Sequence, residues 1–406
     1  MHVSHLSLTH FRNYAQQDLS PAEGANLLLG GNAQGKSNLL EALVVLSTTR
    51  SFRTSVDRHL VNRACLDEPL PYARLGAGIE GSEHRSIELV ITLELANGTL
   101  HSRKHLRLDG TQRRLMDALG VLPTVLFTPE DVALASGPPA TRRRYLDVLL
   151  CQVSREYCRA LSLYNRSLVQ RNHLLRLIRS RRSDPAQLEY WDSLLADSGA
   201  VIARHRQEAI STLAAQAAAE HARLAAGESL CLRYLPGAEL DATEDTAQAV
   251  AEAMRRQYLR ARSDDLERGV TTLGPHRDDF AIQIGGEDAS TYASRGQMRT
   301  AALTLRLVEA DYVAHQLGRE PVLLFDDVMS ELDSARRRAL EEAMLDSRQS
   351  FVTALDASPF SRRFTAAARI FQVSSGAAEP INGPAEGADA EPPDDAGTPP
   401  GSEPPS

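Results

Sequence analysis

Three short segments, far apart in the chain, carry residue types that could bind and hydrolyse a nucleoside triphosphate. The first fits the pattern G-x-x-x-x-G-K-[ST], in which glycines let backbone N–H groups close on phosphate oxygens, the lysine reaches the outer phosphates and the hydroxyl meets Mg²⁺. Its residues are Gly30, Gly31, Asn32, Ala33, Gln34, Gly35, Lys36 and Ser37. ATP with Mg²⁺ is therefore the expected ligand of this phosphate loop.

The other two segments follow much later. Residues 322–327 form an apolar run that ends in Asp326 and Asp327, as expected for a buried strand whose last residues reach a metal ion and an attacking water. Between the two lies the sequence Ser294-Arg295-Gly296-Gln297 at the start of an expected helix. The alternative interpretation of this segment is a polar turn that only caps an ordinary helix. It is less favoured, because the segment lies in order between the two nucleotide motifs.

The elements that must position these residues can also be read from the sequence. An apolar strand over 26–29 precedes the phosphate loop and a helix over 38–46 follows it, so phosphate would meet a helix N-terminus. Strict alternation over 87–95, a turn at Asn97-Gly98 and a returning strand over 100–108 predict a hairpin.

Long helices are expected after Pro129. One apolar stripe runs from Leu146 to Ile178 and a second from Leu188 to Leu213, and the two are expected to pair as a helical arm. A strand over 280–284 and a helix carrying Met298 to Tyr312 then lead into the strand at 322–327.

Composition narrows the class of protein. The 406 residues are 42% hydrophobic, without a run long enough to span a membrane or a signal-peptide pattern, so a soluble cytoplasmic protein is expected. The four cysteines are scattered, which argues against zinc or a disulfide framework and favours ordinary buried thiols.

The net charge of −8 is unevenly distributed. Residues 370–406 hold seven acidic and no basic residues, which leaves 46 acidic against 45 basic residues in the rest of the chain. A nearly neutral body with local arginine clusters is compatible with DNA binding, because phosphates respond to the distribution of charge. The acidic, Pro- and Gly-rich tail is expected to be disordered.

Proteins that place S-x-G-Q at a helix start before a strand ending in acids are ATPases of the ABC class, and further segments narrow the resemblance. From residue 1 to about 374 the chain resembles the RecF family of bacterial recombination and repair ATPases, relatives of Rad50 and SMC heads. The matching segments are 11–14 (FRNY), 38–42 (NLLEA), 50–53 (RSFR), 127–131 (FTPED), 142–147 (RRRYLD), 170–172 (QRN), 274–279 (GPHRDD) and 330–333 (SELD).

The resemblance implies an α/β fold: an ABC-type, SMC/Rad50-like P-loop ATPase head with a helical arm inserted between the phosphate loop and the signature motif. The implied divisions are 1–125 and 262–374 for the two parts of the head, 126–261 for the arm, and 375–406 for a disordered tail.

Residue roles follow from the resemblance. Lys36 and the loop would hold the phosphates, and Ser37 and Asp326 would hold Mg²⁺. Asp327 would orient the attacking water. From a second copy of the chain, Ser294, Gly296 and Gln297 would complete the site.

The resemblance also implies that Arg12 and Asn13 lie near the base and ribose, although a plain surface turn is an equal alternative, and that Asp333 lies at the subunit interface. Ser37 stands where threonine is common, Arg295 where glutamine is frequent, and Thr353 where transporters have a switch histidine. The missing imidazole, together with the short Asp327, suggests slow hydrolysis.

The implied function is ATP-dependent DNA binding in replication, recombinational repair and SOS induction, with weak DNA-stimulated ATPase activity. An ATP-dependent homodimer would clamp single-stranded or gapped DNA and help recombinase loading, together with RecR and RecO and without a membrane. The alternatives are the nucleotide subunit of an ABC transporter and a scaffold that binds ATP only to dimerise.

Contacts with DNA are the least specific expectation. Arg50 and Arg53 follow the phosphate-loop helix, where related heads place a basic residue against DNA, and residues 142–144 and 179–182 are further basic clusters. Each could equally be a solvated helix face. Residues 276–279 invite a metal site, but a hydrogen-bonded turn with an organising role is the favoured interpretation.

Overall fold

The computed structural model describes residues 1–96, 99–225, 227–239 and 246–381. Its central layer is a six-stranded sheet in the order β15-β14-β3-β13-β12-β8, in which every neighbouring pair is parallel except β14 and β15. Its strands are β3 (Gly24–Leu29), β8 (Thr124–Phe127), β12 (Val322–Asp326), β13 (Gln349–Ala354), β14 (Arg369–Ser374) and β15 (Ala377–Pro380). The head is thus divided in the sequence, since β3 and β8 pair with strands that lie much later in the chain.

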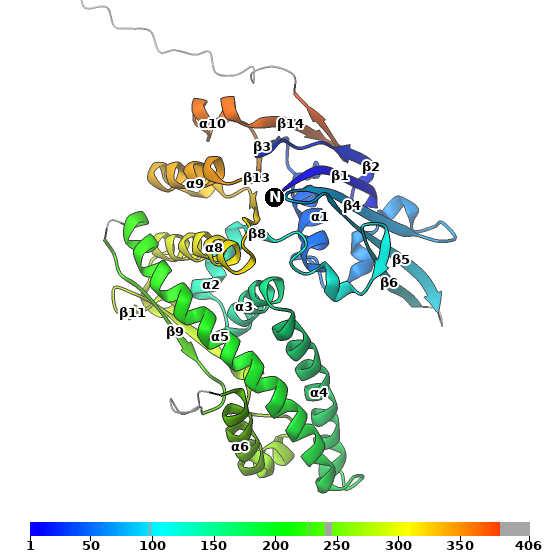
Figure 1. Cartoon of the computed structure of the whole chain (residues 1–406), viewed down its shortest axis with the longest axis vertical. Helices are drawn as coiled ribbons and strands as arrows, with labels where there is room; N and C mark the ends of the chain where they lie inside the picture. Colours follow the sequence, from blue (N-terminus) through cyan, green and yellow to red (C-terminus); the bar gives the residue numbers. More distant parts are fainter. Residues whose placement is uncertain (97–98, 226, 240–245, 382–406) are drawn as a thin grey trace, which may run out of the picture.

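Both faces of this central sheet are buried, as near-continuous apolar strands require. Leu27, Leu323 and Phe325 point into one hydrophobic core, whereas Leu28 and Leu324 point into the other. The second core is closed by α1 (Lys36–Thr48) and by an antiparallel sheet in the order β2-β1-β4-β5-β6-β7. Figure 1 shows α1 between the two sheets.

The antiparallel sheet contains the expected hairpin. Its strands are β1 (His2–Phe11), β2 (Tyr14–Leu19), β4 (Tyr72–Glu80), β5 (Arg85–Ala96), β6 (Thr99–Leu108) and β7 (Thr111–Arg113). β5 and β6 pair from Ile87 opposite Leu108 to Ala96 opposite Thr99, which confirms the predicted strands; the turn at Asn97-Gly98 lies outside the described residues.

Helices cover the other face of the central sheet and extend below it as an arm (Figure 1). They are α2 (Ala133–Ser136), α3 (Pro139–Val153), α4 (Arg155–Arg179), α5 (Leu188–Leu224), α6 (Ala247–Arg268), α7 (Ala289–Tyr292), α8 (Arg295–Leu317), α9 (Ser334–Asp346) and α10 (Arg362–Ala367). Short 3-10 helices are η1 (Asp57–Leu60), η2 (Arg63–Cys65), η3 (Leu115–Ala118), η4 (Pro129–Val132), η5 (Pro185–Gln187), η6 (Pro275–Arg277) and η7 (Met329–Glu331).

The arm differs from the sequence expectation in two ways. The stripe from Leu146 to Ile178 is not one helix, because Ser154 is extended and caps α4 through the N–H of Tyr157, which divides α3 from α4. The expected pairing of α4 with α5 is confirmed. The boundary at residues 261 and 262 is wrong, because it falls inside α6, which ends at Arg268 before the left-handed Gly269.

A small sheet was also missed. β9 (Leu230–Leu235), β10 (Asp279–Ile284) and β11 (Glu287–Asp288) form an antiparallel sheet against α5, and only β10 was expected.

The prediction of disorder from residue 375 is wrong for its first residues, since Ala377–Pro380 form β15; residues 382–406 lie outside the description. Cys65 is buried, but Cys151 and Cys158 are half-buried and Cys231 is exposed, so not all four are buried thiols. In the described parts, no helix combines the length and hydrophobicity needed to span a membrane.

Candidate nucleotide site

The phosphate loop joins β3 to α1 and requires glycine at its last position. Gly35 has φ 123°, and a Cβ there would lie 2.7 Å from Nδ2 of Asn13 and 2.8 Å from the hydroxyl of Tyr14. The Tyr14 hydroxyl donates to the carbonyl of Gly35 at 3.1 Å, and Asn13 Nδ2 donates to the carbonyl of Gln34 at 2.8 Å. The turn between β1 and β2 therefore supports the loop from beneath and leaves its backbone fixed.

Lys36 begins α1 and folds back over the loop. Its ammonium group donates to the carbonyl oxygens of Gly30 at 2.6 Å and Gly31 at 2.8 Å. Burial lowers the pKa of Lys36, while the carboxylates of Asp327 and Asp326 oppose that shift. The lysine is thus a cation held at the loop, close to two carboxylates, which suits a group that must meet phosphate oxygens.

The acidic strand end meets the phosphate loop directly. β13 lies between β3 and β12, and all three parallel strands end at the same edge of the sheet. The hydroxyl of Ser37 donates to Oδ1 of Asp326 at 2.7 Å, and the hydroxyl of Thr353 on β13 donates to the same oxygen at 2.9 Å. Sequence segments almost three hundred positions apart are thereby brought into contact.

Thr353 also holds the second acid, a role that the sequence did not indicate. Its Oγ1 accepts the backbone N–H of Asp327 at 2.9 Å, and Asp327 has φ 52°. The sequence pattern identified Thr353 only as the position that lacks an imidazole. The signal that could have found it is its place at the end of a buried strand beside the acidic one.

The residues present fit a magnesium–nucleotide complex. Ser37 and Asp326 offer a hydroxyl and a carboxylate oxygen within hydrogen-bond distance of each other, and oxygen donors are the ligands that Mg²⁺ prefers. Gly35 has no room for a Cβ, because Asn13 and Tyr14 approach the loop backbone closely at this residue.

Asn13 contacts the phosphate loop, and Arg12 contacts the helix α1 that follows the loop. Arg12 donates through Nε and Nη2 to the fully buried carboxylate of Glu41, at 2.8 and 2.6 Å, and through Nη1 to the carbonyl of His59 at 2.8 Å. Arg12 is thus a bidentate partner of the α1 helix, and Asn13 contacts the loop and accepts from Asn38 Nδ2 at 2.7 Å. Neither position tests the base and ribose contacts.

The signature segment forms the start of α8. The Ser294 hydroxyl accepts the N–H of Gln297 at 3.3 Å, and Oε1 of Gln297 accepts the N–H of Ser294 at 2.8 Å, a reciprocal capping box. Ser294 and Gly296 are exposed, and a Cβ on Gly296 would meet only the Ser294 hydroxyl, at 3.9 Å. No residue that the structure describes therefore requires glycine there.

The signature segment and the phosphate loop are not brought together in one chain. Within the described ranges, no hydrogen bond or ion pair joins residues 294–297 to residues 30–37. Asp333, expected at a subunit interface, caps α9 by accepting the N–H groups of Ala335 and Arg336 and is half-exposed.

One basic cluster has a structural role. Arg142 is nearly buried and donates to both oxygens of Asp279, at 2.6 and 2.8 Å, while Arg143 donates to the carbonyl of Asp278 at 2.8 Å. The suggestion that 142–144 forms a DNA-binding cluster is wrong for these two arginines, because they join α3 to the loop before β10.

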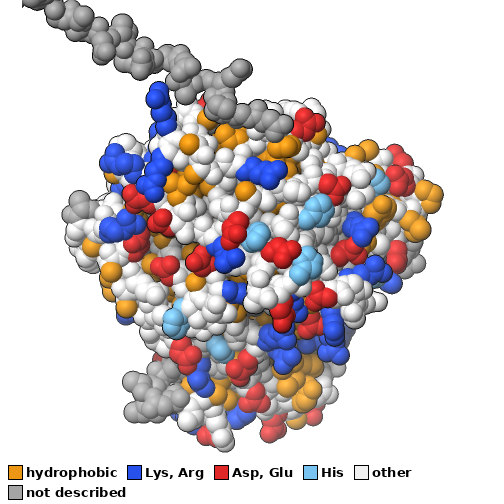
Figure 2. All heavy atoms as spheres, turned by 45° about the horizontal axis from the view of Figure 1, so that its top comes forward, with side chains coloured by type: hydrophobic (Ala, Val, Ile, Leu, Met, Phe, Trp, Pro, Cys, Tyr) orange, Lys and Arg blue, Asp and Glu red, His pale blue; other side chains and the backbone are white. Residues whose placement is uncertain are grey.

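Arg50 and Arg53 remain exposed. Arg53 donates to Oδ1 of Asn38 at 2.8 Å. On the face that Figure 2 displays, basic and acidic side chains are interspersed, in agreement with a nearly neutral body.

The segment 276–279 is a hydrogen-bonded junction. His276 lies between the hydroxyl of Tyr164 at 2.7 Å and the carbonyl of Thr271 at 3.0 Å, and burial lowers its pKa to about 4. The buried Asp278 accepts from Arg206 Nη1 at 2.7 Å and from the N–H of Gly237 at 2.7 Å. Arginines thus occupy both carboxylates of the segment, which supports the organising role over the metal site.

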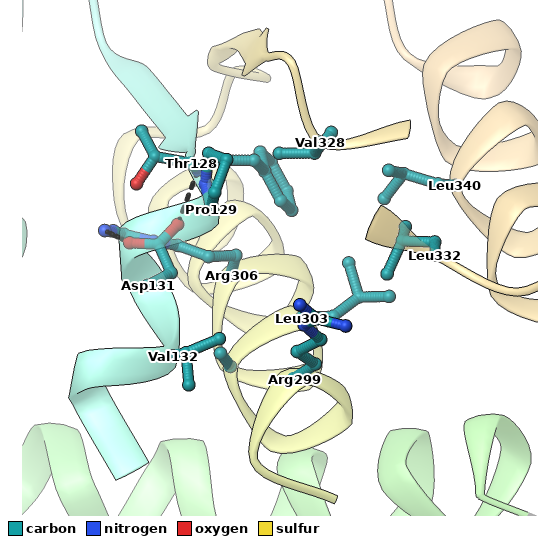
Figure 3. Close-up of a pocket in the computed structure, with 12 residues that line it drawn as sticks. Thr128, Pro129, Asp131, Val132, Arg299, Leu303, Arg306, Val328, Leu332 and Leu340 are labelled. Carbon is teal, nitrogen blue, oxygen red and sulfur yellow. Dashed lines mark hydrogen bonds and ion pairs between the residues drawn. The ribbon is translucent and has the colours of Figure 1, made fainter. Parts of the chain in front are cut away.

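A small cavity of about 50 Å³ lies where α8 meets the central sheet. Figure 3 shows it between η4, α8 and the residues around Val328 and Leu332, with Asp131 of η4 close to Arg306 of α8. Arg306 Nη2 donates to Asp131 at 2.6 Å, and the guanidinium lies 5.3 Å from the ring centroid of Tyr145. The signature helix is therefore anchored to the residues that follow β8.

Comparisons with known proteins agree with this arrangement. Residues 2–379 match the model of the RecF/RecN/SMC N-terminal domain. The chain is 42% identical over 388 residues to the "DNA replication and repair protein RecF" of Chloroflexus aggregans, covering 93% of this chain and 99% of that protein.

This chain belongs to the RecF family of DNA replication and repair proteins. A second relative, the RecF protein of Geobacillus kaustophilus, is 37% identical over 380 residues, covering 93% of this chain and 98% of that one. The expected fold, an ABC-type head with an inserted helical arm, is confirmed.

Solved structures show the same fold. A RecF structure described as "recombination mediator protein RecF-ATPrS in RecFOR pathway" superposes with a TM-score of 0.83 at 33% identity, covering 94% of this chain and 98% of that one. An SMC head bound to the C-terminal winged-helix domain of ScpA has a TM-score of 0.51 at 16% identity, covering 95% and 98%, and supports the head fold alone.

Proposed function

We propose that this RecF-family protein binds ATP with Mg²⁺ at the phosphate loop and that ATP joins two copies into a dimer that acts on DNA during replication and repair. The observation that carries this proposal is the pairing of a built phosphate site with an exposed signature turn on the same chain. Relatives of this family have been solved with ATP and with an ATP analogue, as their descriptions state.

Each residue of the site would make a distinct contribution. Lys36 would exchange its carbonyl partners for phosphate oxygens, and the loop N–H groups would bind the remaining oxygens. Ser37 and Asp326 would hold Mg²⁺, which neutralises developing phosphate charge when it is bound. Asp327, fixed through its N–H by Thr353, would orient the attacking water.

The dimer follows from the incomplete pocket. The N–H groups of Arg295 and Gly296 lie in the first turn of α8, where an α-helix offers no internal acceptors. Together with the Ser294 hydroxyl and the helix dipole, they suit a γ-phosphate held by another copy. Among the residues that the structure describes, no hydrogen bond or ion pair joins this turn to the chain's own phosphate loop.

We further propose slow, DNA-stimulated hydrolysis that times the release of DNA. Binding directed at the DNA backbone by exposed arginines such as Arg50 and Arg53 would depend on strand form and salt rather than on base sequence. Single-stranded or gapped DNA is the proposed substrate. RecR and RecO are the proposed partners, in keeping with the RecFOR pathway in which related structures are placed.

The decisive experiment is size-exclusion chromatography with and without ATP. Lys36→Met should abolish both ATP binding and dimerisation, whereas Ser294→Arg should block dimerisation and leave ATP binding by the monomer intact. Ser82→Arg, a change on an exposed turn between β4 and β5, is the matched control and should dimerise normally. Normal dimerisation of Ser294→Arg would contradict the shared site.

A second measurement separates the clamp from a scaffold. A scaffold that uses ATP only to dimerise predicts that Asp327→Asn releases DNA at the wild-type rate. A clamp timed by hydrolysis predicts a longer-lived complex on gapped DNA for this variant. Membership of the RecF family leaves the transporter alternative without support.

A further inference from the structure

A partly buried chain of polar contacts leads from the signature turn to the long helix α5. The side-chain amide of Gln297 donates to Oε1 of Glu228 at 2.5 Å. The other oxygen of Glu228 lies 3.3 Å from Nε2 of His221, and Nδ1 of His221 lies 3.1 Å from the hydroxyl oxygen of Thr304 on α8. The C-terminal end of α5 and the first turns of α8 are thus joined through one carboxylate.

These contacts fix the orientation of the Gln297 amide. A carboxylate only accepts hydrogen bonds, so Glu228 selects the NH₂ group of Gln297 and turns its Oε1 toward the N–H of Ser294. The Ser294 hydroxyl oxygen accepts from the N–H of Gln297, and among the described residues no acceptor takes its hydrogen, which is thus available to an outside acceptor. A different amide orientation would break the capping box.

Burial makes the arrangement sensitive to change. His221 and Thr304 are fully buried, and the Glu228 side chain is 26% exposed. Because Glu228 only accepts, Nε2 of His221 carries a proton toward it, and removal of the carboxylate would leave a buried donor without its acceptor. Thr304 and Thr300 also donate to the carbonyls of Thr300 and Gly296, at 2.8 and 2.9 Å, so the same contacts continue into the signature turn.

We infer that Glu228, held by His221, is a positioning residue that keeps the signature turn in the form that receives the γ-phosphate of a second copy. This inference rests on the proposed dimer. It assigns a role to a loop residue outside the three nucleotide motifs and to a histidine on α5, and it predicts that neither touches nucleotide in its own chain.

The test compares three variants by ATP-dependent dimerisation in sedimentation velocity. Glu228→Ala removes the acceptor, whereas Glu228→Gln keeps an acceptor for Gln297 and can donate to Nε2 of a His221 ring that is protonated at Nδ1. The control, Glu208→Ala, removes an exposed acid of α5 that pairs with Arg204. Fluorescent-ATP binding at protein concentrations below dimerisation reports on the monomer's own pocket.

Loss of the charged hydrogen bond should weaken dimerisation of Glu228→Ala about tenfold or more, while Glu228→Gln stays within about threefold of wild type and Glu208→Ala is unchanged. Nucleotide affinity of the monomer should stay within about twofold in all three. The inference is overturned if Glu228→Ala dimerises like the control, if Glu228→Gln is as weak as Glu228→Ala, or if monomer affinity falls in parallel.

Hydrogen exchange in the nucleotide-free monomer gives a readout that does not need the dimer. Glu228→Ala should speed exchange of amides at the start of α8, including that of Gln297, and Glu228→Gln should not. Unchanged exchange in Glu228→Ala would refute the positioning role by itself. A wild-type protein that stays monomeric with ATP, by contrast, would refute the proposed function and leave this comparison able to decide the local role.

Discussion

Replacing Thr353 by valine should separate nucleotide binding from hydrolysis. Thr353 is 1% exposed and lies between the two acids: its hydroxyl donates to Asp326 Oδ1 and accepts from the N–H of Asp327, each at 2.9 Å. Valine has nearly the same shape, so the perturbation removes two hydrogen bonds without leaving a cavity.

The magnitude follows from what each acid retains. Asp326 keeps its contact with Ser37, so ATP affinity should change by no more than about threefold. The partly buried N–H of Asp327 loses its acceptor, which costs up to about 1–3 kcal/mol. If the loss of this hydrogen bond raises the activation free energy of hydrolysis by a similar amount, because Asp327 no longer orients the attacking water, turnover falls by about tenfold to a hundredfold.

The assay is single-turnover hydrolysis with saturating protein, followed by phosphate release, alongside equilibrium binding of fluorescent ATP. Thr353→Ser keeps the hydroxyl and is the matched control, with turnover expected close to wild type. If Thr353→Val hydrolyses ATP within twofold of Thr353→Ser, the threonine does not position Asp327 and this reasoning fails.

Three further predictions follow from the packing. Gly35→Ala should weaken ATP binding about a hundredfold or more, because its Cβ would meet the Tyr14 hydroxyl at 2.8 Å in a left-handed backbone; Gly110→Ala, equally left-handed but with nothing near its Cβ, should bind normally in the same titration. Arg171→Met should lower the free energy of unfolding by about 3–5 kcal/mol in urea denaturation, since it leaves the buried Asp265 without its 2.7 Å partner, and a loss below about 1 kcal/mol would contradict that role. Burial lowers the pKa of His276 to about 4, below its unfolded value near 6.5, so between these pH values the unfolded chain binds more protons than the folded chain. The free energy of unfolding should therefore decrease as the pH is lowered, by about 2 kcal/mol between pH 7.5 and 5. His276→Gln should not show this loss.

The sequence predicted most accurately those features that depend on neighbouring residues. The phosphate loop with its flanking strand and helix, the two strands of the alternating hairpin and the helix start after Ser294 are local patterns, and all lie where they were expected. The contact of Ser37 with Asp326 could also be expected, because a shared motif class implies it.

Features formed by long-range packing could not be predicted in the same way. β9 alternates between buried and exposed residues, with Cys231 and Arg233 facing outward, but a strand of six residues is too short for this pattern to stand out in the sequence. The division at Ser154 interrupts an apolar stripe whose spacing continues across it. Arginine clusters give no sign of their partners, and Arg142 finds Asp279 only when β10 packs on α3.

The order of strands in the central sheet has a consequence for synthesis. β3 carries the phosphate loop, yet both of its neighbours, β13 and β14, belong to the last part of the chain, and the turn after β14 closes on the loop through the N–H of Gly376 and the carbonyl of Gln34 at 3.0 Å. During translation, β3 leaves the ribosome long before any strand that can pair with it. A polypeptide that stops short of β13 therefore contains every residue of the phosphate-loop motif but neither of the strands that pair with β3. We therefore expect unfinished products of this gene to bind ATP more weakly than the completed protein does.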